Sequence, residues 1–121
     1  MIQQFNITQK FDLINEHWVP KIVAELNGQY IKLAKIKDEL IWHKHDNEDE
    51  MFLVVKGTLI MNFKDSTSIT QPGEVLIVPK GTEHLPATNG EEVWIMLMEP
   101  MSTKHTGEIV HERTINDLEW I

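Results

Sequence analysis

Residues 42 to 57 read WHKHDNEDEMFLVVKG: a pair of histidines, an acidic run and an apolar segment. On a β-strand, side chains alternate between the two faces, so His43 and His45 point the same way, about 6 to 7 Å apart at the backbone. The polar run from Asp46 to Asp49 suits a turn. If that turn folds the next strand back beside the first, Glu50 lies across from the histidines, and three metal-binding groups meet.

A fourth candidate ligand lies downstream. His84 follows the turn Pro79-Lys80-Gly81 by three residues and falls in a different strand region. Three neutral imidazoles and one carboxylate suit Fe(II), Mn(II) or Ni(II), and Zn(II) and Cu(II) are also compatible. They leave positions of an octahedral ion open, as a catalytic metal requires. Two alternatives stay open: Glu48 as the carboxylate ligand, and exposed histidines that share these spacings by chance.

The composition of the 121 residues limits the classes of function. We expect one domain, residues 1–121, because chains of this length rarely hold two. A net charge of -8 and a single arginine, Arg113, disfavour nucleic acid, whose phosphates require clustered basic residues. The apolar runs are strand-sized and too short to cross a bilayer, so we expect no membrane segment. Because the sequence has no cysteine and no visible secretory signal, we expect a cytoplasmic protein.

Turn residues recur at short intervals from Asn27-Gly28 to Asn89-Gly90, and the segments between them are rich in apolar and β-branched residues. This pattern predicts an all-β sandwich or barrel with antiparallel strands. The expected strands are 22–26, 30–36, 40–43, 51–55, 59–63, 75–78 and 93–98. Only the ends differ: residues 10–18 are expected to form one or two helical turns, and 114–117 has the form of a helix-capping box.

Strand alternation also indicates which apolar residues lie near the site. If the histidine pair and Glu50 face inward, Ile41, Phe52 and Val54 do so too and line an apolar pocket, although ordinary core is the better explanation for each residue taken singly. The segment 93–98 is apolar on both faces, so the sequence does not indicate which face points inward. A strand of this kind is expected to have its outer face covered by another layer or a second subunit, and we therefore expect a homodimer.

The remaining ionisable residues are weaker candidates. His105 can serve as a proton-transfer group at the mouth of the pocket because imidazole titrates near neutrality, although an exposed loop histidine is the commoner outcome. His17 and His111 lie in the flanking segments. Tyr30 and Lys32 share one face of an early strand, and the sequence does not place that face inside or outside the pocket.

The two histidine-containing segments resemble the two sequence motifs of the cupin superfamily. The first segment comprises His43-Lys44-His45, four residues, Glu50, six residues and Gly57. The second comprises Gly73, five residues, Pro79-Lys80-Gly81, two residues and His84. Fifteen residues separate the segments, the short gap typical of bacterial single-domain cupins. The resemblance covers about residues 37–98, and Lys37 and Thr88 stand where the family motifs usually have glycine and asparagine.

The resemblance implies a double-stranded β-helix, or jelly-roll barrel, with flanking strands and short helical turns at both ends. It also implies the metal ligands His43, His45, Glu50 and His84. The chain is similar to small cupins often labelled mannose-6-phosphate isomerase-like, a label that reflects fold more than activity.

These expectations favour a metalloenzyme that acts on a small molecule, of oxygenase type or of isomerase or lyase type, with one divalent metal. The alternative is a metal-anchored small-ligand binding or sensor module without turnover. An isomerase usually needs a proton-transfer residue beside the metal, and His105, Tyr30 and Lys32 are the candidates for that role. The identity of the small molecule is not indicated by the sequence.

Overall fold

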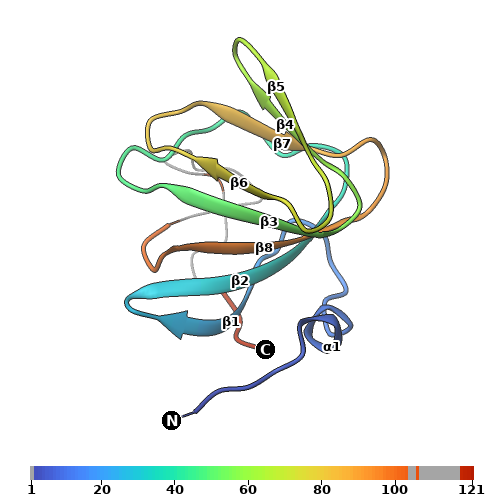
Figure 1. Ribbon diagram of the computed structural model, residues 1–121, viewed down its shortest axis with the longest axis vertical. Coiled ribbons are helices and arrows are strands. Elements are labelled where there is room, and N and C mark those ends of the chain that lie inside the picture. Colours follow the sequence, from blue (N-terminus) through green and yellow to red (C-terminus); the bar gives the residue numbers. More distant parts are fainter. Residues whose placement is uncertain (1, 104–105, 107–117) are drawn as a thin grey trace.

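The strands of this protein form two antiparallel sheets, in a computed structural model that describes residues 2–103, 106 and 118–121. One sheet has five strands in the order β1-β2-β8-β3-β6, and the other has three in the order β5-β4-β7 (Figure 1). The strands are β1 (Lys21–Leu26), β2 (Gln29–Ile36), β3 (Glu50–Lys56), β4 (Leu59–Phe63), β5 (Thr67–Thr70), β6 (Val75–Val78), β7 (His84–Ala87) and β8 (Val93–Pro100). The predicted all-β jelly-roll class is confirmed. In the described part of the chain, no helix is long and apolar enough to span a membrane.

Side chains from both sheets meet in an inner core. Leu59 and Met61 of the small sheet are fully buried there with Phe52, Val54 and Ile95 of the large sheet. The alternation along β8 answers the question that its sequence left open: Val93, Ile95 and Leu97 face inward, and Trp94, Met96 and Met98 lie on the outer face. The same alternation along β3 places Glu50 on the inner face with Phe52 and Val54.

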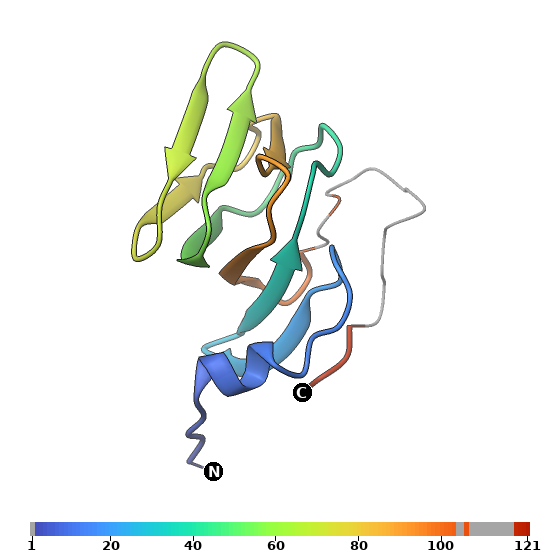
Figure 2. The same cartoon turned by 90° about the vertical axis from the view of Figure 1, so that its right-hand side faces the viewer.

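The helix α1 (Ile7–Phe11) begins earlier than predicted and covers part of the outer face of the large sheet. Asn6 caps it, because its side chain accepts a hydrogen bond from the Gln9 amide at 3.0 Å. Figure 2 shows the helix at one end of the molecule and the β4–β5 hairpin at the other. Phe11 and Ile14 pack beneath the helix in an outer cluster with Val23 and Leu33.

The prediction of helical turns through residue 18 was wrong. Trp18 lies beyond α1 at a φ of 63° and packs into the inner core rather than beside Phe11. Its backbone amide donates to the Lys35 carbonyl at 2.9 Å, and its indole N–H donates to the Lys37 carbonyl at 2.8 Å. These tertiary hydrogen bonds with the end of β2 replace those that a continued helix would have made.

The predicted strand 40–43 is also wrong, since only single bridges occur here, one from Glu39, just before the segment, to Ala87 and one from His43 to His84. β5 was not among the expected strands, and β7 was expected only as a strand region around His84, without bounds. The sequence of β7 contains Pro86, which usually argues against a paired strand. Its partner β4 is bonded to β5 on the other side, so β7 is an edge strand, where proline is tolerated. The capping box 114–117 lies outside the described residues.

Replacing Gly57 with alanine is expected to destabilise the protein more than replacing Gly28. Both residues have positive φ, +80° and +78°, which costs an alanine about 1 to 2 kcal/mol. A Cβ at Gly57 would also lie 2.9 Å from Val93 Cγ2 and 3.0 Å from the Glu92 carbonyl oxygen, whereas one at Gly28 meets no atom within 4 Å. We expect about 1 to 3 kcal/mol more for Gly57→Ala, measured by urea denaturation; equal costs would contradict the close approach.

Candidate metal centre

Four side chains that sequence analysis selected as ligands lie together on the inner side of the fold. His43 and His45 come from the segment before β3, Glu50 is the first residue of β3, and His84 is the first residue of β7. All four are buried, with at most 3% of any of them exposed, and their potential ligand atoms all lie within 4.8 Å of one another. Glu50 Oε1 lies 3.4 Å from His45 Nε2 and 3.5 Å from His84 Nε2. The group can hold a metal ion.

Backbone hydrogen bonds hold the two histidine segments together. The amide of His43 donates to the His84 carbonyl at 3.0 Å, and the amide of His84 donates back at 2.9 Å. The Gly81 amide donates to the His45 carbonyl at 2.7 Å. Asp49 accepts from the Lys80 amide at 2.9 Å, so the acidic run 46–49 is fastened to the turn that precedes His84. The arrangement therefore does not depend on regular strand pairing at His43 and His45.

The ring orientation of two histidines is set by backbone carbonyls. Nδ1 of His43 lies 2.9 Å from the Ile41 carbonyl oxygen, and Nδ1 of His84 lies 2.8 Å from that of Thr82. A carbonyl only accepts, so each Nδ1 carries the proton and each neutral ring presents an Nε2 lone pair, as in metal-binding histidines. His84 Nε2 and Glu50 Oε1 are buried without a hydrogen-bond partner among the described residues, a costly state that a bound ion would relieve.

Electrostatics favour the protonation states that a metal requires. Burial, and secondarily the nearby His84, lower the pKa of His43 to about 4, so this imidazole is neutral at neutral pH. Burial alone would raise the pKa of Glu50. The neighbouring Glu99, His45 and His84 side chains favour the ionised form, which outweighs burial and lowers the pKa of Glu50 well below its ordinary value. A neutral imidazole and an ionised carboxylate are the forms that bind metal, so no proton has to leave either group first.

The metal-free protein is expected to lose stability as the pH falls from about 6.5 to about 4, because His43 remains neutral when folded while it becomes protonated when unfolded. A pKa lowered from 6.5 to about 4 corresponds to about 3 kcal/mol. Burial and the Glu50 carboxylate raise the pKa of Glu99. Above the ordinary carboxyl range the folded protein therefore binds more protons than the unfolded chain, so the contribution of Glu99 to stability decreases as the pH rises. The His43→Gln variant lacks the first effect, so between pH 6.5 and pH 4 the wild type should lose about 3 kcal/mol more than the variant in urea denaturation; parallel profiles would contradict this account.

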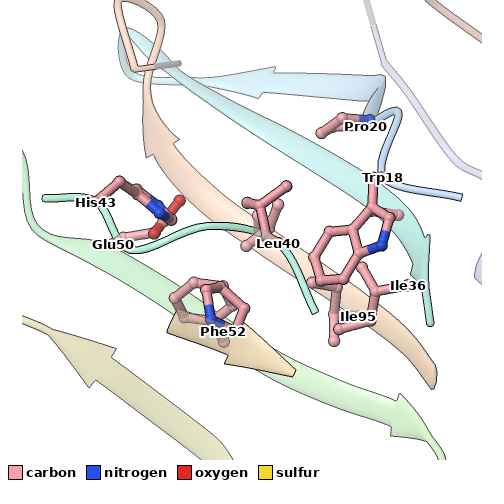
Figure 3. Close-up of a pocket in the computed structure, with 11 residues that line it drawn as sticks. Trp18, Pro20, Ile36, Leu40, His43, Glu50, Phe52 and Ile95 are labelled. Carbon is pink, nitrogen blue, oxygen red and sulfur yellow. The ribbon is translucent and has the colours of Figure 1, made fainter. Parts of the chain in front are cut away.

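An apolar cavity of about 30 Å³ adjoins the cluster. His43 and Glu50 lie at one end of it, and Trp18 with Ile36 and Ile95 lies at the other (Figure 3). Of the three predicted pocket residues, Phe52 lines this cavity. Val54 belongs to the inner core and Ile41 is half-buried against it, but neither lines the cavity.

The other sequence candidates that the structure describes do not join the cluster. Glu48, the alternative carboxylate, is outside it and accepts a hydrogen bond from the Asn47 amide at 3.2 Å. His17 pairs with Glu92 at 2.7 Å and is 39% exposed. Tyr30 contacts Trp120 edge to face, with ring centroids 5.6 Å apart. His105 and His111 lie outside the described residues.

Sequence analysis missed two residues near the site. Trp18, expected on a helix, forms the far wall of the cavity. Glu99 is fully buried on the inner face of β8, where Lys32 donates to it at 2.8 Å. A signal for Glu99 was present, since it continues the spacing of Val93, Ile95 and Leu97. It was not usable, because both faces of that strand are apolar and the inward one was unknown.

The fold and this buried His-His-Glu-His group define a class of protein that a family comparison also finds. Residues 30–99 match the family Cupin_2, described as the cupin domain, so more than half of the chain is covered and the protein belongs to the cupin superfamily.

Individual relatives agree with this assignment. A crystal structure of a cupin-2 domain containing protein from Shewanella frigidimarina is 44% identical, with a TM-score of 0.77 over 79% of this chain and 93% of that one. A structure from Neisseria meningitidis is 27% identical, with a TM-score of 0.74 over 81% and 99% of the two chains. The uncharacterized protein YdbB of Bacillus subtilis is 38% identical over 51% of this chain and 56% of its own length. This chain thus spans about half the length of that curated relative.

Proposed function

We propose that this cupin binds one divalent transition metal through His43, His45, Glu50 and His84, and that it is a metalloenzyme acting on a small molecule. One observation carries the proposal: four buried donor groups converge, and among the described residues the inward atoms of His84 and Glu50 have no hydrogen-bond partner. Three imidazoles and one carboxylate satisfy Fe, Mn, Ni or Zn, and the choice among these ions stays a prediction.

The chain's own residues would prepare the site for such a molecule. Once bound, the ion would supply Lewis-acid or oxygen-activating chemistry at positions that the four side chains leave open. Glu50 offsets part of the ionic charge, and the backbone contacts of His43 and His84 keep their rings aimed inward. The apolar wall beside the cluster keeps water away from it, and the cavity of about 30 Å³ has room for little more than a water-sized group, so a ligand would bind mainly through oxygen atoms that face the metal. Whether the reaction is of oxygenase type or of isomerase or lyase type stays open.

A metal-anchored binding or sensor module is the second candidate. The composition of the cavity wall favours this candidate. Among the described residues that line the cavity, the titratable ones are His43 and Glu50. Both are metal ligands in the proposal, so the wall offers no separate acid or base for isomerisation. His105 remains the sequence-based candidate for proton transfer.

Reconstitution followed by a turnover screen tests the proposal. The protein would be loaded with Fe²⁺, Mn²⁺, Ni²⁺ or Zn²⁺, its metal content measured, and small hydroxy acids, oxo acids and enediols then incubated with it under air. Oxygen uptake or a new product by NMR supports an enzyme. Ligand-dependent changes in the water relaxation of the Mn²⁺ form without any product support the sensor. Absence of stoichiometric metal with every ion contradicts both.

We further propose a cytoplasmic homodimer in which residues 1–121 form one domain, and membership of the mannose-6-phosphate isomerase-like group stays a prediction. The dimer is supported by the outer face of the large sheet beyond α1. Val75 and Ile77 on the edge strand β6 are 54% and 53% exposed, opposite the half-buried Leu53 and Met51 of β3. A contiguous apolar face of this kind suits a second subunit. Light scattering would measure the molar mass in solution.

A further inference from the structure

We propose that Lys32 and Glu99 are positioning residues for the metal centre: a buried pair that holds the Glu50 carboxylate toward the three histidines and thereby raises metal affinity. The inference rests on the proposed function and concerns two side chains outside the four-residue ligand group.

The sheet register places the three side chains in a row on its inner face. Tyr30 of β2 is opposite Glu99 of β8, and Lys32 is opposite Leu97, so Lys32 and Glu99 are diagonal neighbours. Met51 of β3 is opposite Met98, and one step further along this antiparallel register Glu50 faces Glu99. Directly opposite residues, as Glu50 and Glu99 are in this register, have their Cβ atoms about 4.5 to 5.5 Å apart. Glu99 therefore lies between the lysine and the proposed ligand.

The contacts confirm a connected set of polar groups. Lys32 Nζ donates to Glu99 Oε1 at 2.8 Å and to the Thr103 carbonyl at 3.2 Å. Lys32 is 1% exposed and Glu99 is fully buried. The other oxygen of Glu99, Oε2, is buried without a donor in the part of the chain that the structure describes, and burial together with the adjacent Glu50 carboxylate raises the pKa of Glu99. Lys32 fixes Glu99, and Glu99 in turn adjoins Glu50.

Stability alone does not account for this pair. Taking a lysine and a carboxyl group out of water is costly, and well-packed apolar replacements of buried pairs of this kind are often as stable or more so. The neighbouring inward residues Leu97 and Ala34 are apolar, so the same sheet accommodates apolar side chains here. By contrast, groups that hydrogen-bond to a metal ligand typically contribute 10- to 100-fold in affinity, because they restrict the ligand to the binding orientation.

The decisive variant removes both charges together: Lys32→Met with Glu99→Leu. Neither member of the Lys32–Glu99 pair is left buried without the other, so we expect a folded protein with a melting temperature close to that of the wild type. Its affinity for Co²⁺, measured by calorimetry, is expected to fall by about 10- to 100-fold, and the visible absorption spectrum of the bound Co²⁺ should change as Glu50 loses its orientation. The matched control is Lys21→Met with Glu16→Leu, which removes a pair at 2.9 Å between the edge strand β1 and the segment before it, and it should leave both readouts unchanged.

A second variant keeps the test decisive if the double variant does not fold. Glu99→Gln retains the side-chain shape, can still accept from Lys32 and can donate to Glu50, so its Co²⁺ affinity should stay within about threefold of the wild type while Glu99→Leu loses at least about tenfold. Wild-type affinity and spectrum in the double variant, or equal affinities for Glu99→Gln and Glu99→Leu, would overturn the positioning role and leave the proposed metal site intact. Failure of the wild-type protein itself to bind Co²⁺ would overturn both.

Discussion

Replacing His84 with alanine is expected to lower metal affinity by more than about 100-fold, beyond the range typical of groups that only orient a ligand. His84 is fully buried, its Nδ1 is held by the Thr82 carbonyl, and its Nε2 lies 3.5 Å from Glu50 Oε1. Without its imidazole, two histidines and one carboxylate remain. Calorimetric titration with Co²⁺ or Mn²⁺, and the metal content after desalting, measure the effect.

The control for this variant is His17→Ala, because His17 is half-exposed, pairs with Glu92 and lies outside the cluster. Its metal affinity should equal that of the wild type. Folding of His84→Ala is expected to survive, since the bridge between residues 43 and 84 is made by backbone groups. Far-UV circular dichroism checks this. Unchanged affinity in a folded His84→Ala protein would remove His84 from the proposed ligand set.

Replacing Phe11 with alanine is expected to lower the free energy of unfolding by about 3 to 5 kcal/mol, the range for removal of a buried aromatic side chain. Phe11 is fully buried and stacks on Trp94, with ring centroids 4.7 Å apart and an angle of 18° between the rings. It is the buried residue of α1, so its loss releases the helix from the outer face. Urea denaturation measures the cost.

Leu13→Ala serves as the matched control, because Leu13 is 58% exposed and only two residues from Phe11. A cost within about 0.5 kcal/mol is expected for it. Metal affinity of the folded Phe11→Ala protein should be unchanged, because Phe11 belongs to the outer cluster and the cavity beside the metal centre is lined by the inner core. Equal costs for the two variants would contradict the anchoring of α1 by Phe11.

The candidate site was largely predictable because its signals are local. Glu50 was placed across from the histidine pair by the expected turn at residues 46–49, and the alternation along β3 buries it with Phe52 and Val54. His84 was located by the turn at Pro79-Lys80-Gly81, whose backbone is bonded to the His45 carbonyl and the Asp49 side chain. His43 and His45 are both buried as predicted, although their segment makes only a single bridge. Two-residue spacing thus placed them correctly even where the strand itself was wrong.

The features that sequence analysis missed depend on contacts between distant segments. Trp18 has helical spacing from Phe11, but hydrogen bonds to the Lys35 and Lys37 carbonyls draw it into the inner core. Lys32 meets Glu99 because of the register in which β2 pairs with β8. The two residues are 67 positions apart in the sequence. Periodicity in a single segment contains no information about such a partner.

Anomalous X-ray diffraction from crystals of the Mn²⁺- or Zn²⁺-loaded protein tests the metal centre most directly. The account predicts one strong peak per chain at the absorption edge of the metal, about 2.0 to 2.2 Å from a nitrogen of each of His43, His45 and His84 and from an oxygen of Glu50. A peak beside the exposed acidic run 46–49 in place of this one, or no peak within the cluster, would contradict it.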